Sequence, residues 1–116
     1  MTKQVLGAMA ISLVVSELSL AHAVLLEARP SANGVVAGPD VTVELRFNSR
    51  IDPARSRLML VFPDQRFQLL PVQTSSTPAR LGARATGLIA GEYKLRWQVL
   101  ASDGHITRGE ISFHVK

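Results

Sequence analysis

The chain has 116 residues, contains no cysteine and carries a formal net charge of +4. This length suits one domain, and the absence of cysteine excludes both a disulfide framework and a thiolate metal site. The basic residues are scattered rather than gathered in runs, and no zinc-finger or RNP pattern is present, so the composition argues against a nucleic-acid-binding protein.

Residues 1–21 have the organisation of a secretory signal peptide. Lys3 supplies a positive charge, the stretch from Val5 to Val15 is apolar, and a short segment with small residues follows. The apolar stretch is too short to span a bilayer, which needs about 20 residues. We therefore expect export to the periplasm, with residues 1–21 as the signal peptide and residues 22–116 as the exported domain.

Two overlapping cleavage patterns leave the start of the exported domain open. One pattern of small residues ends at Ala21 and places the cut before His22, whereas the other ends at Ala23 and places the cut before Val24. The first cut makes His22 the new N-terminus, and the second removes it. The cleavage pattern alone does not decide between them.

After the leader, the chain alternates short strand-like runs with turn residues. Apolar residues recur at every second position from Val41 to Phe47 and again from Tyr93 to Val99, which is the period of a half-buried strand. Expected strands cover residues 23–29, 41–47, 57–62, 66–70, 81–85, 92–100 and 107–115. Such spacing, without a helical period, predicts an all-β, immunoglobulin-like antiparallel β-sandwich of about seven strands with Greek-key connections.

Three large side chains have predicted places in this sandwich. Tyr93, at the entry to the penultimate strand, is either a tyrosine corner or an ordinary core residue. Trp97 has an apolar setting and is expected in the core rather than on a binding surface. Met59 lies in a largely apolar strand and is expected in the core as well.

The candidate site is the stretch from Ser102 to His105, between the last two expected strands. Asp103-Gly104 is typical of a two-residue type I′ hairpin turn, so Asp103 alone needs no function. His105 follows the turn and is expected to be exposed. His114 alternates outward at the far end of the last strand, where it is expected to be a surface residue.

A metal site becomes plausible if His22 is the N-terminal residue. Its α-amine and its imidazole can close a chelate ring on one metal ion, because an α-amine has a pKa near 8 and loses its proton readily to a metal. His105 would add a third nitrogen and Asp103 an oxygen. Three nitrogens and one oxygen in a tetragonal arrangement suit Cu(II).

The motifs 22–25, 91–97 and Ser102-Asp103-Gly104-His105 with Gly109 together resemble the CopC family of periplasmic copper-binding proteins. The resemblance implies a cupredoxin-like copper-binding β-sandwich, a role in copper resistance or homeostasis, and a CopD-type inner-membrane partner. It also implies that His22, Asp103 and His105 are Cu(II) ligands.

Two departures from the family pattern bear on the metal. Some members carry a methionine-rich Cu(I) segment, where this chain has only Met59, so we expect a Cu(II)-only member. Some members also place a glutamate where this chain has Asn48 and Ser49, either of which can contact the site through water. The affinity and any fifth ligand stay open.

Three functions follow in order of preference. The first is a non-enzymatic, monomeric copper carrier or buffer. The second is an oxidoreductase that uses an N-terminal histidine as a copper brace, as in lytic polysaccharide monooxygenases. The third is a plain sandwich for adhesion or assembly. The scattered arginines are interpreted as a solvated basic surface, with a docking face for an acidic partner or an anionic membrane as the alternative.

Overall fold

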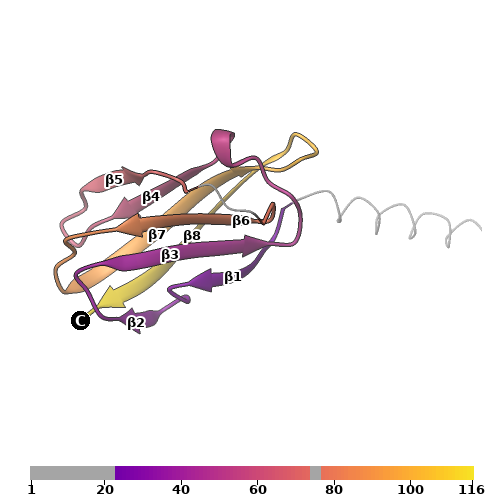
Figure 1. Cartoon of the computed structure of the whole chain (residues 1–116). Helices are drawn as coiled ribbons and strands as arrows, with labels where there is room; N and C mark the ends of the chain where they lie inside the picture. Colours follow the sequence, from indigo (N-terminus) through magenta and orange to yellow (C-terminus); the bar gives the residue numbers. More distant parts are fainter. Residues whose placement is uncertain (1–22, 74–76) are drawn as a thin grey trace, which may run out of the picture.

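The computed structural model describes residues 23–73 and 77–116, which form two β-sheets packed face to face (Figure 1). The strands are β1 (Leu25–Arg29), β2 (Gly34–Val36), β3 (Val41–Phe47), β4 (Arg57–Val61), β5 (Phe67–Leu70), β6 (Arg80–Ala85), β7 (Gly91–Leu100) and β8 (Ile106–Val115). One sheet has the order β1-β3-β6, and the other has the order β2-β8-β7-β4-β5. The predicted all-β sandwich is confirmed.

The helical content of the described residues is one 3₁₀ turn, η1 (Pro53–Arg55). Asp52 caps it by accepting a hydrogen bond from the backbone N–H of Ala54 at 3.1 Å. Pro53 suits the first turn because it has no backbone N–H that would need a partner. Within the same residues, no helix has the length and apolar character needed to cross a membrane. The predicted signal peptide and His22 lie outside the described residues.

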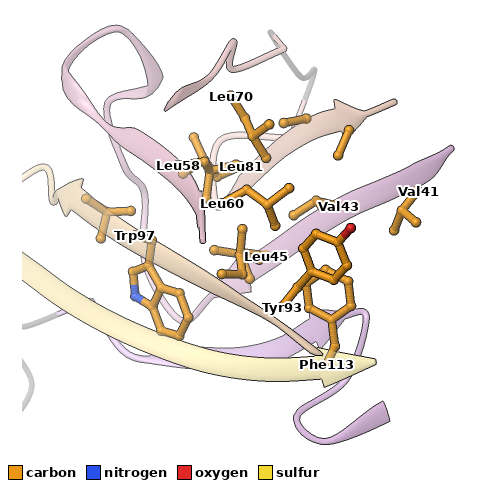
Figure 2. Close-up of a cluster of buried hydrophobic side chains, with 14 of the residues drawn as sticks. Val41, Val43, Leu45, Leu58, Leu60, Leu70, Leu81, Tyr93, Trp97 and Phe113 are labelled. Carbon is orange, nitrogen blue, oxygen red and sulfur yellow. The ribbon is translucent and has the colours of Figure 1, made fainter. Parts of the chain in front are cut away.

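The core lies between the two sheets and follows the period-2 pattern of the sequence (Figure 2). In β3 the alternation is complete, because Val41, Val43, Leu45 and Phe47 are all buried. The facing sheet contributes Leu58, Leu60, Leu95 and Val99, among others, and β6 beside β3 contributes Leu81. Burial of apolar surface on this scale is the main driving force for folding.

Tyr93 combines the two roles between which the sequence left a choice. Its ring is fully buried, stacks on Phe113 with centroids 5.7 Å apart, and meets the edge of Phe62 at 5.5 Å. Its hydroxyl donates a hydrogen bond of 2.8 Å to the carbonyl of Ile89, four residues upstream, which is the tyrosine-corner arrangement. Burial raises the pKa of the Tyr93 phenol above its ordinary value.

The strand that sequence analysis missed is β2, which has only three residues. It pairs with β8 in parallel, with Val35 opposite His114, whereas the other strand pairs of the described residues are antiparallel. Three residues are too few to show a period-2 pattern, and their pairing is with a strand far away in the sequence. The other strands begin and end within about two residues of the expected ranges.

The predictions for Trp97 and Met59 had different outcomes. Trp97 is buried in the core, as expected, and its indole lies so close to Gly109 that a Cβ on that glycine would be 2.1 Å from Cζ2. The expectation that Met59 is a core residue is wrong. Leu58 and Leu60 point inward, so the residue between them points to the outer face of the five-stranded sheet, where Met59 is half-buried.

Candidate metal centre

The loop that joins β7 to β8 is built differently from the predicted type I′ turn. The N–H of Gly104 donates to the carbonyl of Ala101 at 3.0 Å, and the N–H of Ala101 donates to the carbonyl of His105 at 2.9 Å. Gly104 has φ of 90°, whereas Asp103 is not among the described residues with positive φ. The loop is therefore a three-residue connection in which glycine takes the left-handed position after the turn, and Asp-Gly also suits this connection.

This loop brings the two predicted ligands within it into contact. One carboxylate oxygen of Asp103, Oδ1, accepts a hydrogen bond of 3.0 Å from the backbone N–H of His105. The other, Oδ2, lies 3.0 Å from the Nδ1 atom of the His105 ring. The His105 side chain is 56% exposed and the Asp103 side chain is 34% exposed. The pair is thus preformed at the surface, and a metal ion can reach it.

The first described residues of the chain are held at the same end of the sandwich. Ala23 is 1% exposed. The N–H of Val24 donates to Oδ1 of Asn48 at 2.8 Å, and the N–H of Asn48 donates to the carbonyl of Val24 at 2.9 Å. Asn48 therefore holds the backbone just after His22 by two reciprocal hydrogen bonds.

The residues after Asn48 contact the β7–β8 loop. The N–H of Ser102 donates to the carbonyl of Arg50 at 3.1 Å, and Ile51 forms an isolated bridge with Ala101. The segment 48–51 thus has the start of the domain on one side and the Asp103–His105 loop on the other. Figure 1 shows the start of β1 and the β7–β8 loop at the same end of the molecule.

His114 is placed away from this end. It precedes the last residue of β8, nine positions after His105, and a strand of that length covers about 30 Å. Its Nδ1 lies 3.3 Å from Oε2 of Glu92 on β7. The expected surface position of His114 is confirmed.

Sequence reasoning identified Asp103 and His105 but gave Asn48 a different role. It expected Asn48 or Ser49 to contact the site through water, whereas the Asn48 side chain binds the backbone of Val24. Nothing in the sequence signals this contact beyond the position of Asn48 directly after β3. Within residues 23–73 and 77–116, no cluster of three metal-binding side chains forms.

Comparisons with known proteins agree on one family. A family model described as the CopC domain matches residues 25–116. The chain is 29% identical over 109 residues to copper resistance protein C of Xanthomonas campestris pv. juglandis, covering 87% of this chain and 85% of that protein. It is 28% identical over 99 residues to protein YobA of Escherichia coli K12, covering 83% and 80%.

Two solved structures of copper proteins are similar to the chain. The crystal structure of CopC from Methylosinus trichosporium OB3b matches with a TM-score of 0.74 and 33% identity, covering 82% of this chain and 94% of that one. PcoC from Escherichia coli, described as a methionine-rich copper resistance protein, matches with a TM-score of 0.66 and 24% identity over 82% and 99% of the two chains, and supports the fold.

Proposed function

Because the chain belongs to the CopC family, we propose that it binds Cu(II) in the periplasm and serves copper resistance or homeostasis. One observation carries the proposal: the loop that carries Asp103 and His105 contacts the segment 48–51 through Ala101 and Ser102, and the backbone that follows His22 contacts the same segment through Asn48. Members of this family are copper-binding proteins and not enzymes, so the oxidoreductase alternative is set aside.

The proposed ligands are His22, through its α-amine and its imidazole, Asp103 and His105. The spacing within the described pair supports this choice. Two neighbouring donors of a tetragonal ion, each about 2 Å from the metal and at right angles, lie about 2.8 Å apart. The 3.0 Å between Nδ1 of His105 and Oδ2 of Asp103 is close to that value.

The position of Ala23 supports the proposal that His22 supplies the remaining two nitrogen ligands, its α-amine and its imidazole. Consecutive Cα atoms are about 3.8 Å apart, so His22 must lie within one such step of the buried Ala23. The two hydrogen bonds between Val24 and Asn48 fix the backbone of Val24 and so restrict the conformations of the chain just before it. Because the backbone at the start of the domain is already restricted, less conformational entropy is lost when a metal ion joins the chain end to the β7–β8 loop.

The preference for Cu(II) over Cu(I) is proposed from donor type. Nitrogen and carboxylate oxygen suit Cu(II), whereas Cu(I) prefers thioethers and thiolates. The one methionine of the exported domain, Met59, lies on the outer face of the five-stranded sheet. Amine and imidazole ligands must also lose their protons to bind, so affinity is expected to fall in acid.

The proposal is tested by titrating Cu(II) into the protein that begins at His22. We expect one Cu(II) per chain and an electron paramagnetic resonance spectrum with nitrogen couplings. His105→Ala should weaken binding by at least about a hundredfold, or about 2.8 kcal/mol, while the matched variant His114→Ala binds like wild type. Failure of the wild type to bind Cu(II), or a spectrum unchanged in His105→Ala, would contradict the proposal.

We further propose that the protein acts as a monomer and exchanges copper with a CopD-type inner-membrane protein. The exposure of His105 supports this exchange, because a partner can approach the ligand directly. Copper uptake by vesicles that contain the membrane protein, with and without the copper-loaded domain, measures it. Uptake that does not respond to the loaded domain would contradict the exchange.

A further inference from the structure

The outer face of the five-stranded sheet carries exposed apolar side chains that the proposed copper site does not use. Phe67 and Leu69 on β5 are 68% and 53% exposed. Leu69 is directly opposite Met59 on β4, so the three side chains share one face. Of the other large exposed apolar residues, Val35 on β2 and Ile106 on β8 lie on the same face, whereas Val24 and Leu26 lie at the start of the domain and Ile89 precedes β7. Among the described residues of this face, β5 is the strand that carries two such side chains.

These side chains border a hollow rather than a flat surface. A groove of about 350 Å³ is lined by Met59, Phe67 and Leu69 together with Arg57, Arg96 and Arg108. The registers explain the arrangement, because Met59 is opposite Arg96 on β7. Arg57 is opposite Gln98, which is in turn opposite Arg108 on β8. The groove therefore crosses four strands, with an apolar side on β5 and β4 and a basic side on β7 and β8.

The charges around the groove do not cancel. Arg96 is paired with Glu110, whose Oε1 lies 2.6 Å from the Arg96 Nε, and this contact lowers the pKa of the glutamate below its ordinary value. Arg108 donates from Nε to the neutral amide oxygen of Gln98 at 3.0 Å. Among the described residues, no carboxylate pairs with Arg57 or Arg108. The groove thus keeps an excess of two positive charges.

The strand that carries the apolar side of the groove is also the edge of its sheet. The order β2-β8-β7-β4-β5 leaves one side of β5 without a neighbouring strand in that sheet. In an antiparallel pair the hydrogen-bonded positions alternate, and the N–H of Phe62 donates to the carbonyl of Arg66 at 2.7 Å. Phe67 and Leu69 therefore direct their backbone groups away from β4. Exposed apolar edge strands are usually avoided unless something covers them.

We propose that this groove docks an acidic polypeptide segment of a partner protein, with an apolar side chain of the segment between Phe67, Leu69 and Met59. Guanidinium groups bind carboxylates with two parallel hydrogen bonds, so Arg57 and Arg108 select for acidic residues beside the apolar one. A concave groove suits a segment that inserts a side chain better than it suits a flat lipid surface. The interaction requires no copper.

The test uses a synthetic peptide in which glutamate and leucine alternate, with a peptide of alternating lysine and leucine as its control. In nuclear magnetic resonance titrations of the exported domain, we expect the acidic peptide to shift the amide signals of β5, β4, β7 and the start of β8. The basic peptide should cause no such shifts. Added salt should weaken the interaction, because its charged contacts lie at the surface.

Two pairs of matched variants separate the groove from general charge and hydrophobicity. Arg57→Glu and Phe67→Ser should each weaken peptide binding by at least about tenfold. Arg84→Glu on β6 and Ile89→Ser, which change an arginine and an exposed apolar residue elsewhere, should leave it unchanged. Circular dichroism checks that each variant is folded, which is expected because the altered side chains are exposed.

Three outcomes would overturn the proposal. The acidic peptide does not bind at millimolar concentration, or its shifts map to another face, or the groove variants bind as tightly as the controls. Vesicles of phosphatidylglycerol and of phosphatidylcholine provide the membrane alternative. Binding of the anionic vesicles through Arg57 and Phe67, without binding of the peptide, would assign the groove to a lipid surface instead.

Discussion

Two histidine–carboxylate pairs lie at the opposite ends of β8, and they are alike in their local chemistry. Nδ1 of His105 is 3.0 Å from Asp103, and Nδ1 of His114 is 3.3 Å from Glu92. Both imidazoles are about half exposed, so neither is set apart by burial. A list of candidate metal ligands drawn from such contacts would include both pairs.

The pairs differ in what lies beside them. The Asp103–His105 pair is on a loop whose backbone bonds to the segment 48–51, and that segment also holds the start of the domain. The Glu92–His114 pair joins two neighbouring strands, and the third strand beside it contributes Val35, which has no ligand atom in its side chain. A surface pair therefore becomes a candidate metal site when the fold brings a further donor-bearing segment to it.

The largest expected loss of Cu(II) affinity at the Asp103–His105 pair comes from extending the chain by one alanine before His22. The extension keeps every side chain and displaces only the free α-amine, so a chelate ring is lost while the Asp103–His105 pair is untouched. We expect Cu(II) affinity to fall about a thousandfold, at about 1.4 kcal/mol for each tenfold step. Isothermal titration measures the change, and equal affinity in both forms would show that the amine is not a ligand.

A second comparison exchanges the carboxylate of each pair for an amide. Asp103→Asn keeps an oxygen that can accept from the backbone N–H of His105, so the loop should persist while the negative charge is lost. We expect Cu(II) affinity to fall about tenfold to a hundredfold, or about 1.4 to 2.8 kcal/mol, because a neutral amide oxygen is a weaker ligand for Cu(II) than a carboxylate. Glu92→Gln is the control and should have no effect. Similar losses in the two variants would mean that the two pairs are equivalent.

The role of the neighbouring segment is tested at Asn48. Asn48→Ala removes the acceptor for the N–H of Val24 but keeps the backbone hydrogen bond from Asn48 to the carbonyl of Val24, so it loosens the start of the domain while Asp103 and His105 stay in place. We expect about a tenfold loss in Cu(II) affinity and a stability loss of about 1 kcal/mol for the hydrogen bond. Ser49→Ala is the matched control. If Asn48→Ala binds copper as tightly as Ser49→Ala, the clamp does not position the chain end.

The regular strands were predictable because one face of each is buried, and burial imposes a period of two. β3 and β7 show that period clearly and were found with nearly their observed bounds. β4 misled the prediction for Met59, because a nearly continuous apolar run hides which residues point inward. β2 escaped detection because its pairing with β8 depends on distant residues rather than on its own sequence.

The geometry of the candidate site was predictable only in part, for the same physical reason. Asp103 and His105 are two residues apart, so any tight loop keeps them close, even though the turn is not of the predicted type. The clamp by Asn48 joins residues 24 positions apart. No local pattern encodes such a contact, and it follows only from how β1 pairs with β3. The family resemblance implied that the chain ends meet, but it did not indicate that Asn48 bonds to Val24.

The smallest expected effect concerns stability without copper, where the two pairs should become equivalent. Both are exposed, and exposed ion pairs contribute about 0.2–1 kcal/mol at most. His105→Ala and His114→Ala should therefore each lower the melting temperature of the copper-free domain by only a few degrees, since 1 kcal/mol corresponds to about 4–8 °C at this size. Copper that binds only the folded state raises the melting temperature by mass action. Calorimetry with and without Cu(II) should thus show the rise in wild type and His114→Ala but not in His105→Ala. A large loss in copper-free His105→Ala would instead assign the Asp103–His105 pair a structural role.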